Sequence, residues 1–375
     1  MKYMKMAAIA MMALALFSCN KKDEPKKPEA AALNIHISDA TLRALEAGVE
    51  QNAETGVTTD VVLTLLPSGR QITMTADDIT AAKGTDGKTY DVGEVVAQVS
   101  LTANYKVSPE PEITAFQGQQ ATFATTMPLA ATPTDVTVGT DPQDSKTTIY
   151  SVTLEPKPIV ARVEVAGDIM AGIGNAGLPK NSSNKTAYKS IKVEQVYINN
   201  YLLTRNAENR TYIKGQAGNF ASTPDTKMCD EIKEAKQADF KAKKLVAGYQ
   251  LFPIKENEAA SEHSYYDHII LRLTVTYDTE VAKGYPTEPQ TRYVTMVRFM
   301  KENTGDLKSF EAGTIYKLGL EELTKDFTTD DNGNPTGPDT PNPEQEGKML
   351  LNVKVKPYKW ETVNIKPDVN GGYKK

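Results

Sequence analysis

Short stretches that alternate apolar and polar residues recur along most of this 375-residue chain, and they limit its fold more than any other feature. Residues 33–38, LNIHIS, place Leu33, Ile35 and Ile37 on one face of a strand and polar side chains on the other. The same alternation returns in SIKVEQVYINN, DHIILRLTVTY and TRYVTMVRFM, with Gly and Pro turns between the segments. Many such strands and few helical stretches predict a mainly β protein built from a pair of β-sandwiches.

A few segments depart from this alternation. We expect a short helix at residues 76–83, ADDITAAK, and a longer one at residues 226–247 that ends at Gly248. Residues 40–56 are polar and predict a loop around Arg43. The prolines at positions 156 and 158 separate two strands, and we place the boundary between the two sandwiches there.

The first nineteen residues predict an export signal that ends in a lipid attachment site. Two lysines precede an apolar run at residues 6–16, which is too short to span a bilayer permanently. Ser18 followed by Cys19 is the pattern that a lipoprotein signal peptidase cleaves, so Cys19 would become the acylated N-terminus, for example with palmitate. The alternative is an ordinary secretory signal with an incidental cysteine. Asn20 is not an aspartate, so retention at an inner membrane is not indicated.

After lipidation, Cys229 is the one cysteine left, and it cannot form a disulfide within the chain. We expect it to be a small buried hydrophobic side chain, without a catalytic role. The formal net charge is −5, and no basic stripe is interleaved with aromatic residues. Nucleic acid is therefore not an expected partner.

Three motifs resemble ligand-binding or metal-binding patterns, but the residues around each of them do not fit such a site. Residues 172–177, GIGNAG, match a dinucleotide-binding spacing, yet Pro179 and KNSSNK come next and cannot open the required helix. His263 and His268 lie five residues apart instead of the four that a zinc-binding helix needs. Residues 330–334, DDNGN, lack the alternating ligands and the final glutamate of a calcium loop. We expect no catalytic residue, no metal site and no cofactor.

The two ends of the chain suit each other. Residues 348–375 predict two strands held beyond a Pro- and Gly-rich linker at 329–347. Val363 and Ile365, with Val369 beyond Pro367, follow the alternation of Leu33, Ile35 and Ile37. A sheet that lost its first strand would expose an apolar groove, and burying each apolar side chain of an incoming strand stabilises it by roughly 1.5–3 kcal/mol. The nineteen linker residues could reach roughly 60 Å at about 3.1 Å each. A donor strand that fills the next molecule's groove makes a head-to-tail contact, which grows a filament.

These features together resemble the type V pilins, or fimbrillins, of Bacteroidia. The patches that carry the resemblance are the lipidation motif with KKDE, a first strand followed by an arginine, QVSLTAN, VARVEV, and IYKLGL with its linker and LNVKVKPYKWETVNI. The resemblance implies two transthyretin-like β-sandwich domains, and export as an outer-membrane lipoprotein precursor. It further implies that an arginine-specific surface protease removes the first strand.

Carried over to this chain, the resemblance makes Arg43–Ala44 the cleaved bond and the residues from Trp360 onward the donor strand. Arg70, in PSGR, is a competing cleavage site, but it lies after a strand in a tight turn where a cut would damage the domain. The vacated strand would be the one that contains Leu33, Ile35 and Ile37. The donor residues would be Trp360, Val363, Ile365 and Val369.

The expected organisation has six parts. They are a signal peptide (1–19), a lipidated propeptide with the first strand (20–43), two β-sandwich domains (44–156 and 157–328), the linker (329–347) and the donor segment (348–375). The expected function is the shaft subunit of an adhesive pilus on the cell surface. Its expected partners are other copies of the chain, tip and anchor subunits, the protease, and receptors on host or bacterial surfaces.

Other functions fit some of the same residues. A tip subunit should lack a donor strand, and an anchor subunit should keep its lipid and resist cleavage. A glycan-binding surface lipoprotein would pack its C-terminal strands on its own body. Such a protein usually stacks sugars on several exposed aromatic residues. Trp360 is the single tryptophan here, which argues against glycan binding, but the 17 tyrosines keep this alternative open. An exported enzyme is the least favoured of these alternatives.

Overall fold

The computed structural model shows a mainly β protein with short helices, as the sequence predicts. It describes residues 30–38, 43–46, 49–54, 57–117, 127–140, 146–171, 178–207, 209–212, 215–216, 219–220, 226–253, 267–296, 298–301, 305–307, 310–337, 350–355 and 361–368. The α-helices in these ranges are α2 (Ala76–Lys83) and α4 (Gln237–Lys241). The 3₁₀ helices there are η1 (Ile113–Phe116), η2 (Ile169–Ala171), η4 (Thr226–Met228), η5 (Glu234–Lys236) and η7 (Leu320–Asp326). Among the described residues, no helix is long and apolar enough to cross a membrane.

The chain divides into two compact units, each drawn from three segments. The first unit consists of Met1–Ser38, Val62–Leu101 and Thr132–Leu154. The second consists of Asp39–Val61, Thr102–Ala131 and Glu155–Lys375. The domain boundaries drawn from the sequence at 43, 156 and 328 stay predictions.

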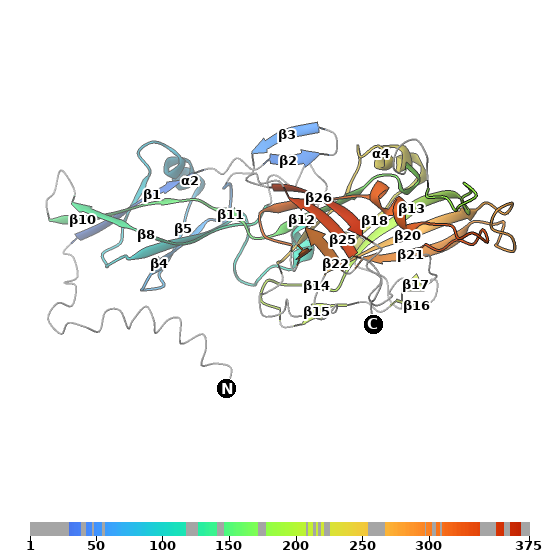
Figure 1. The fold of residues 1–375 in the computed structure, drawn as a ribbon. Helices are drawn as coiled ribbons and strands as arrows, with labels where there is room; N and C mark the ends of the chain where they lie inside the picture. Colours follow the sequence, from blue (N-terminus) through green and yellow to red (C-terminus); the bar gives the residue numbers. More distant parts are fainter. Residues whose placement is uncertain are drawn as a thin grey trace. The chain divides into compact units, whose positions relative to one another are not determined.

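A four-stranded sheet of the first unit has the order β6–β1–β10–β9 (Figure 1). Its strands are β6 (Lys88–Asp91), β1 (Ala30–Ile37), β10 (Thr147–Leu154) and β9 (Thr137–Thr140). β1 runs antiparallel to β6 and parallel to β10, so it is hydrogen-bonded on both sides.

A five-stranded sheet has the order β11–β8–β7–β4–β5. Its strands are β11 (Lys157–Pro158), β8 (Leu129–Asp135), β7 (Gln98–Ala103), β4 (Val62–Leu66) and β5 (Gln71–Thr73). The turn between β4 and β5 is the Pro-Ser-Gly turn that the sequence predicts, with Gly69 at φ +73°, a left-handed conformation that glycine adopts without steric cost.

Two further sheets belong to the second unit. A seven-stranded sheet has the order β19–β12–β24–β26–β25–β22–β23, and a four-stranded sheet has the order β18–β13–β20–β21. The seven strands are β19 (Ala247–Leu251), β12 (Ala161–Ala166), β24 (Thr314–Gly319), β26 (Glu361–Asp368), β25 (Leu350–Val355), β22 (Arg298–Lys301) and β23 (Gly305–Leu307). The four strands are β18 (Cys229–Glu231), β13 (Tyr188–Asn199), β20 (His268–Tyr277) and β21 (Gln290–Met296).

Three two-stranded sheets complete the described strands. They are β2 (Arg43–Glu46) with β3 (Val49–Glu54), β14 (Tyr201–Leu202) with β15 (Arg210–Thr211), and β16 (Gly215–Gln216) with β17 (Asn219–Phe220). The first of these pairs corrects the loop expected at residues 40–56. Among the described strands, β2 and β3 pair only with each other, and a two-stranded hairpin has few hydrogen bonds to hold it.

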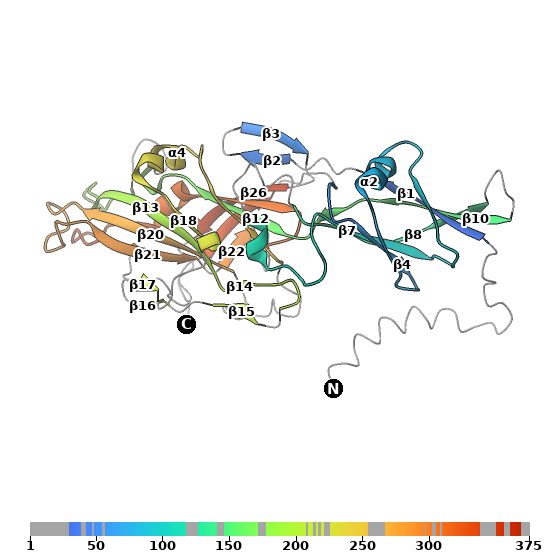
Figure 2. The same cartoon turned by 180° about the vertical axis from the view of Figure 1, so that it is seen from behind.

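The alternation read from the sequence corresponds to burial in the long strands. In β20, Leu271, Leu273 and Val275 are buried, whereas Arg272 and Thr274 between them are half-buried. β13, β20 and β21 run side by side in both views (Figures 1 and 2). Over residues 271–275 one face of β20 therefore builds the core, as period-2 patterning requires, whereas residues 268–271 are buried on both faces.

The helix α2 is the one that the sequence predicts at residues 76–83. Thr75 Oγ1 accepts a hydrogen bond from the Asp78 backbone N–H, and the Asp78 carboxylate accepts one from the Thr75 N–H, which makes a capping box. Asp78 also pairs with Lys88 of β6 at 2.6 Å. The hydrogen bond from Lys88, followed by that from Thr75, lowers the pKa of Asp78 to about 2. These contacts join α2 to the strand that flanks β1.

The long helix predicted at residues 226–247 is wrong. Residues 229–231 form β18, which pairs with β13 in the register Tyr197↔Cys229, and α4 covers five residues. The buried Met228, Ile232 and Phe240 have a spacing that suits a helical face. The free edge of β13 offers backbone hydrogen bonds that this stretch takes instead, and Gly248 lies within β19.

The predicted linker starts as an ordered turn. The Asp330 carboxylate accepts hydrogen bonds from the backbone N–H groups of Asn332 at 2.9 Å and Asn334 at 2.7 Å. Asp331 accepts from the Ser182 backbone N–H at 3.1 Å, and the Gly337 N–H donates to the Tyr188 hydroxyl at 3.1 Å. Residues 329–337 are thus held on the second unit, which shortens the stretch available as a linker.

Candidate functional site

The strand β1 fills a slot that is one strand wide. Its apolar residues Leu33 and Ile35 are fully buried and Ile37 is 4% exposed, as the period-2 pattern predicts. The register sets Leu33 beside Tyr150, Ile35 beside Val152 and Ile37 beside Leu154, all on β10. These three β10 residues are buried as well. The core-facing side of the contact between β1 and β10 is therefore apolar at all three of these pairs.

The ends and the polar face of β1 are tied down by hydrogen bonds. The Val92 N–H donates to the Ala31 carbonyl at 2.9 Å, and the Ser38 N–H donates to the Leu154 carbonyl at 3.0 Å. On the polar face, Asn34 Nδ2 donates to the Asp86 carbonyl at 3.1 Å and to Thr89 Oγ1 at 3.3 Å. The side chain of Asn34 thus binds the turn that leads into β6.

Gly87 is what lets this turn approach β1 so closely. A Cβ at position 87 would lie 2.4 Å from Asn34 Oδ1 and 2.7 Å from His36 Nε2, and the backbone φ is +70°. Another residue here would be strained in this left-handed backbone conformation, and its Cβ would displace the ends of the Asn34 and His36 side chains. Gly87, Asp86 and Thr89 form a socket for the side chain at position 34, and we call these three residues the asparagine socket.

Removing β1 would leave a specific defect. β6 and β10 would each face a gap with unpaired backbone N–H and C=O groups. The three apolar side chains that leave are worth roughly 1.5–3 kcal/mol each in burial. A strand of the same alternation would restore both contributions.

The bond predicted to be cut lies in β2. The register pairs Arg43 with Glu54 and Ala44 with Ala53 of β3. Arg43 comes six positions after Ile37, the last residue of β1, so a cut after Arg43 would separate the whole of β1 from the rest of the chain. The lipidation and signal-cleavage residues Ser18 and Cys19 lie outside the described residues.

The C-terminal strands pair with their own chain. β26 lies between β24, to which it is parallel, and β25, to which it is antiparallel. The register sets Val363 beside Tyr316 and Ile365 beside Leu318, two positions on β24 whose side chains are buried. Trp360 and Val369, also predicted to belong to the donor strand, lie outside the described residues. In the uncleaved chain, the predicted donor strand therefore has a home position.

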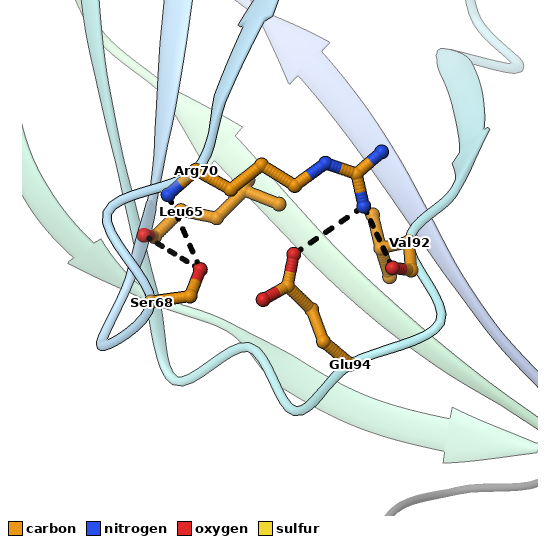
Figure 3. A network of polar contacts seen from close by, with 5 residues as sticks. All are labelled: Leu65, Ser68, Arg70, Val92 and Glu94. Carbon is orange, nitrogen blue, oxygen red and sulfur yellow. Dashed lines mark hydrogen bonds and ion pairs between the residues drawn. The ribbon is translucent and has the colours of Figure 1, made fainter.

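Arg70, the competing cleavage site, is held in the turn after β4 (Figure 3). Its Nη1 donates to the Val92 carbonyl at 2.7 Å and meets Glu94 Oε1 at 3.3 Å. The Arg70 backbone carbonyl accepts from the Leu65 N–H at 2.8 Å, and Ser68 Oγ accepts from the Arg70 N–H at 3.2 Å. A protease needs an extended, unpaired backbone at the bond it cuts, and these contacts oppose that state.

The motifs set aside in the sequence are described only in part. Residues 172–177 and His263 lie outside the described residues, and His268 is the buried first residue of β20. The carboxylate of Asp330 is used by its own turn, and these hydrogen bonds, led by those from Asn334, hold its pKa below the usual range. In the ranges that the structure describes, no three His, Cys, Asp or Glu residues gather as metal ligands.

Cys229 packs against Tyr197, Ile270 and Tyr293, as a half-buried hydrophobic side chain. Burial first, and then the neighbouring acidic residues 230 and 231, raise the pKa of its thiol from an ordinary value of 9 to about 12. At physiological pH the group is a thiol and not a thiolate, so it lacks the nucleophilic form.

Cys229 should therefore react slowly with a thiol reagent. At pH 8 its thiolate fraction falls about a thousandfold below that of a cysteine with a pKa of 9, so the reaction with a chromogenic disulfide should slow by a similar factor. The measurement uses the chain cut after Arg43, in which Cys229 is the one cysteine. The same protein in concentrated guanidinium is the control, and equal rates in the two states would contradict the prediction.

Several residues of the slot gave no signal in the sequence. Tyr150, Thr89 and Gly87 sit in segments that read as an ordinary strand and turn, and only the pairing with β1 brings them together. The home position of β26 between β24 and β25 was likewise not predicted from the pattern. A strand's alternation tells which face is buried, but it does not name the neighbour.

Comparisons with known proteins give structural neighbours at low identity. No protein-family model matches the chain, and no curated protein sequence matches it. A candidate cell adhesion protein from Bacteroides eggerthii has a TM-score of 0.42 and 11% identity, with 91% of this chain and 96% of that chain covered. A candidate cell adhesion protein from Parabacteroides distasonis has a TM-score of 0.45 and 13% identity, with 91% and 99% covered. A fimbrilin from Porphyromonas gingivalis has a TM-score of 0.42 and 10% identity, with 90% and 98% covered.

Proposed function

We propose that the chain is the shaft subunit of an adhesive surface pilus of the type V class and has no catalytic role. It is exported as a lipoprotein precursor with its lipid on Cys19, and an arginine-specific protease cuts the Arg43–Ala44 bond. The cut releases β1, and the C-terminal donor strand of a second copy takes its place. Repeated from copy to copy, this head-to-tail contact does not close and grows a fibre.

The central place of β1 carries this proposal. β1 has a hydrogen-bonded neighbour on each side and a buried apolar face. A strand in this position normally stays in its sheet for as long as the domain is folded. Here that strand precedes an arginine in the two-stranded sheet of β2 and β3, so one cut would free β1 to leave and make a complete sheet incomplete. A shaft role is favoured over a tip role because a tip has no subunit beyond it and needs no donor strand.

A second candidate function is favoured by the home position of β26. A self-contained surface lipoprotein that binds glycans would keep its C-terminal strands on its own body, as they are in the uncleaved chain. The two candidates differ in their behaviour after cleavage. The shaft subunit assembles, whereas the self-contained protein stays a monomer.

Limited proteolysis tests the two candidates. Purified precursor is treated with an arginine-specific protease, and unheated samples are run on SDS gels. For a shaft subunit we expect a ladder of SDS-resistant oligomers, because each junction buries an apolar strand and forms two backbone ladders. The same treatment of a chain truncated after Trp360, which lacks the donor strand, should give no ladder.

The outcomes separate cleanly. A ladder that needs both the cut and the residues after Trp360 supports the shaft subunit. Cleaved, full-length protein that stays monomeric by light scattering at high concentration contradicts it and favours the glycan-binding alternative. Circular dichroism of the truncated chain checks that it remains folded, so that its failure to assemble can be assigned to the missing strand and not to unfolding.

A further inference from the structure

We infer that the β1 slot and the home position of β26 are equivalent sites, and that a donor strand enters the slot in one register, with Asn364 in the place of Asn34. The inference rests on the proposed function and adds what that function does not contain, namely the register and a residue that selects it. The observations come from two different sheets of the chain.

The strands that receive β1 and β26 share a sequence. β10 reads TIYSVTL over residues 148–154, and β24 with the residue after it reads TIYKLGL over residues 314–320. Tyr150 and Tyr316 are both buried, as are Val152 and Leu318 two positions later. Both strands therefore present the same apolar surface, with a tyrosine first and an aliphatic side chain second.

β1 and β26 also resemble each other in sequence, and the matching residues pair with matching positions of β10 and β24. β1 pairs Leu33 with Tyr150, whereas β26 pairs Val363 with Tyr316, and both pairings are parallel. The next positions are Asn34 and Asn364, and then Ile35 and Ile365. Each received strand thus presents an aliphatic residue, an asparagine and an isoleucine to the same three positions of its parallel neighbour.

The other neighbour is equivalent too. β1 is antiparallel to β6, and β26 is antiparallel to β25. Asn34 lies opposite Thr89 on β6, and Asn364 lies opposite Lys354 on β25. β26 would therefore exchange one parallel and one antiparallel ladder at home for one of each in the slot, with no change of register.

The asparagine socket selects this register. In the slot, the side chain at position 34 satisfies the Asp86 carbonyl and Thr89 Oγ1 and lies against Gly87. Among the residues of β26, Asn364 is the one asparagine. A slip of two residues would present Thr362 or Lys366 to the socket, and the larger Lys366 meets a turn that is already close to the strand. A slip of one residue would turn the apolar face of β26 outward.

Cysteine pairs measure the register directly. The variant Thr89→Cys/Asn364→Cys, in a Cys229→Ala background, is cut after Arg43, assembled under reductant and then oxidised. Its subunits should become joined by disulfides, seen as a ladder that survives boiling without reductant. The pairs Thr89→Cys/Thr362→Cys and Thr89→Cys/Lys366→Cys report the registers shifted by two. A shift of two residues moves the Cα by about 7 Å, beyond disulfide reach, so their cross-linking yield should be at least about tenfold lower.

A second pair of cysteines tests the same register if the first variant assembles poorly. Ser151 lies beside Asn34 on β10, so Ser151→Cys/Asn364→Cys should cross-link from the other side of the slot. Uncleaved Asn34→Cys/Thr89→Cys is the positive control, since these two side chains touch in the precursor. When this variant is first oxidised and then treated with the protease, the disulfide should keep the propeptide attached to the rest of the chain.

The result separates the register from the function. Oligomers cross-linked at position 364 with both partners support the inference. Oligomers that cross-link at position 362 or 366, or at none of these positions, overturn the proposed register. They do not contradict the proposal that the chain is a pilus subunit. Failure of the cleaved wild-type chain to form oligomers overturns both.

Discussion

The variant Arg43→Lys should form no SDS-resistant oligomers after treatment with an arginine-specific protease, whereas the wild-type chain forms a ladder. Lysine keeps the positive charge and a long side chain, so the precursor should fold as before, but it lacks the guanidinium that the protease requires. β1 then stays covalently attached and keeps its slot filled. The measurement is the fraction of protein in oligomers on unheated SDS gels, which we expect to fall to the background of untreated precursor.

The matched control is Arg70→Lys. Arg70 is held by the Val92 carbonyl and by Glu94 in the turn after β4 (Figure 3). Arg43 lies in the two-stranded sheet of β2 and β3, and we expect that sheet to open more readily. We expect Arg70→Lys to assemble as the wild type does. If Arg70→Lys stops assembly and Arg43→Lys does not, the cleavage assignment is wrong.

Locking β26 in its home position should stop assembly almost completely. Lys317→Cys/Asn364→Cys joins β26 to β24 at a register pair, and Lys354→Cys/Asn364→Cys joins it to β25. Because the slot between β6 and β10 holds one strand, β26 must leave both home neighbours to enter it. Cleaved, oxidised protein should therefore stay monomeric.

Reductant provides the control within the same sample. Breaking the disulfide restores two thiols at positions 317 or 354 and 364, so the reduced protein should assemble while the oxidised protein does not. Mass spectrometry of the oxidised chain establishes that the disulfide has formed before assembly is measured. Oligomers in oxidised samples would show that β26 is not the strand that moves.

The equivalence of the two sites also limits the driving force. Leaving home costs β26 one parallel and one antiparallel ladder, and the slot returns one of each. The register pairs in both places match an aliphatic residue with a buried tyrosine. In the proposed assembly the slot must therefore be emptied first, and cleavage of the precursor would be the step that controls it.

The length of chain available to the donor strand depends on β25. Residues 356–360 separate β25 from β26, and five residues span at most about 18 Å. If β25 also leaves its sheet, the free stretch runs from 338 to 360, because residues 329–337 are held by Asp330 and Asp331. The linker is therefore shorter than the nineteen residues expected from the sequence if β25 stays in its sheet, and longer if β25 leaves.

Local features of the chain could be predicted without its structure. The alternation in residues 33–38 predicted the burial of Leu33, Ile35 and Ile37, and Thr75 with Asp78 marked the start of α2. The helix at 226–247 failed because its apolar spacing suits a helix, while the edge of β13 was available to pair with residues 229–231. That competition between a local preference and a distant partner is not visible in the segment itself.

The period of each apolar pattern and the short turns depend on neighbouring residues, so the sequence was enough to establish a mainly β fold and to predict two strands at the C-terminal end of the chain. Which strands become neighbours was decided by the folded molecule alone. Every strand offers the same backbone hydrogen bonds, and the choice of partner depends on contacts between residues far apart in the chain. β1 between β6 and β10, Gly87 against Asn34, and β26 beside β24 all arise in this way.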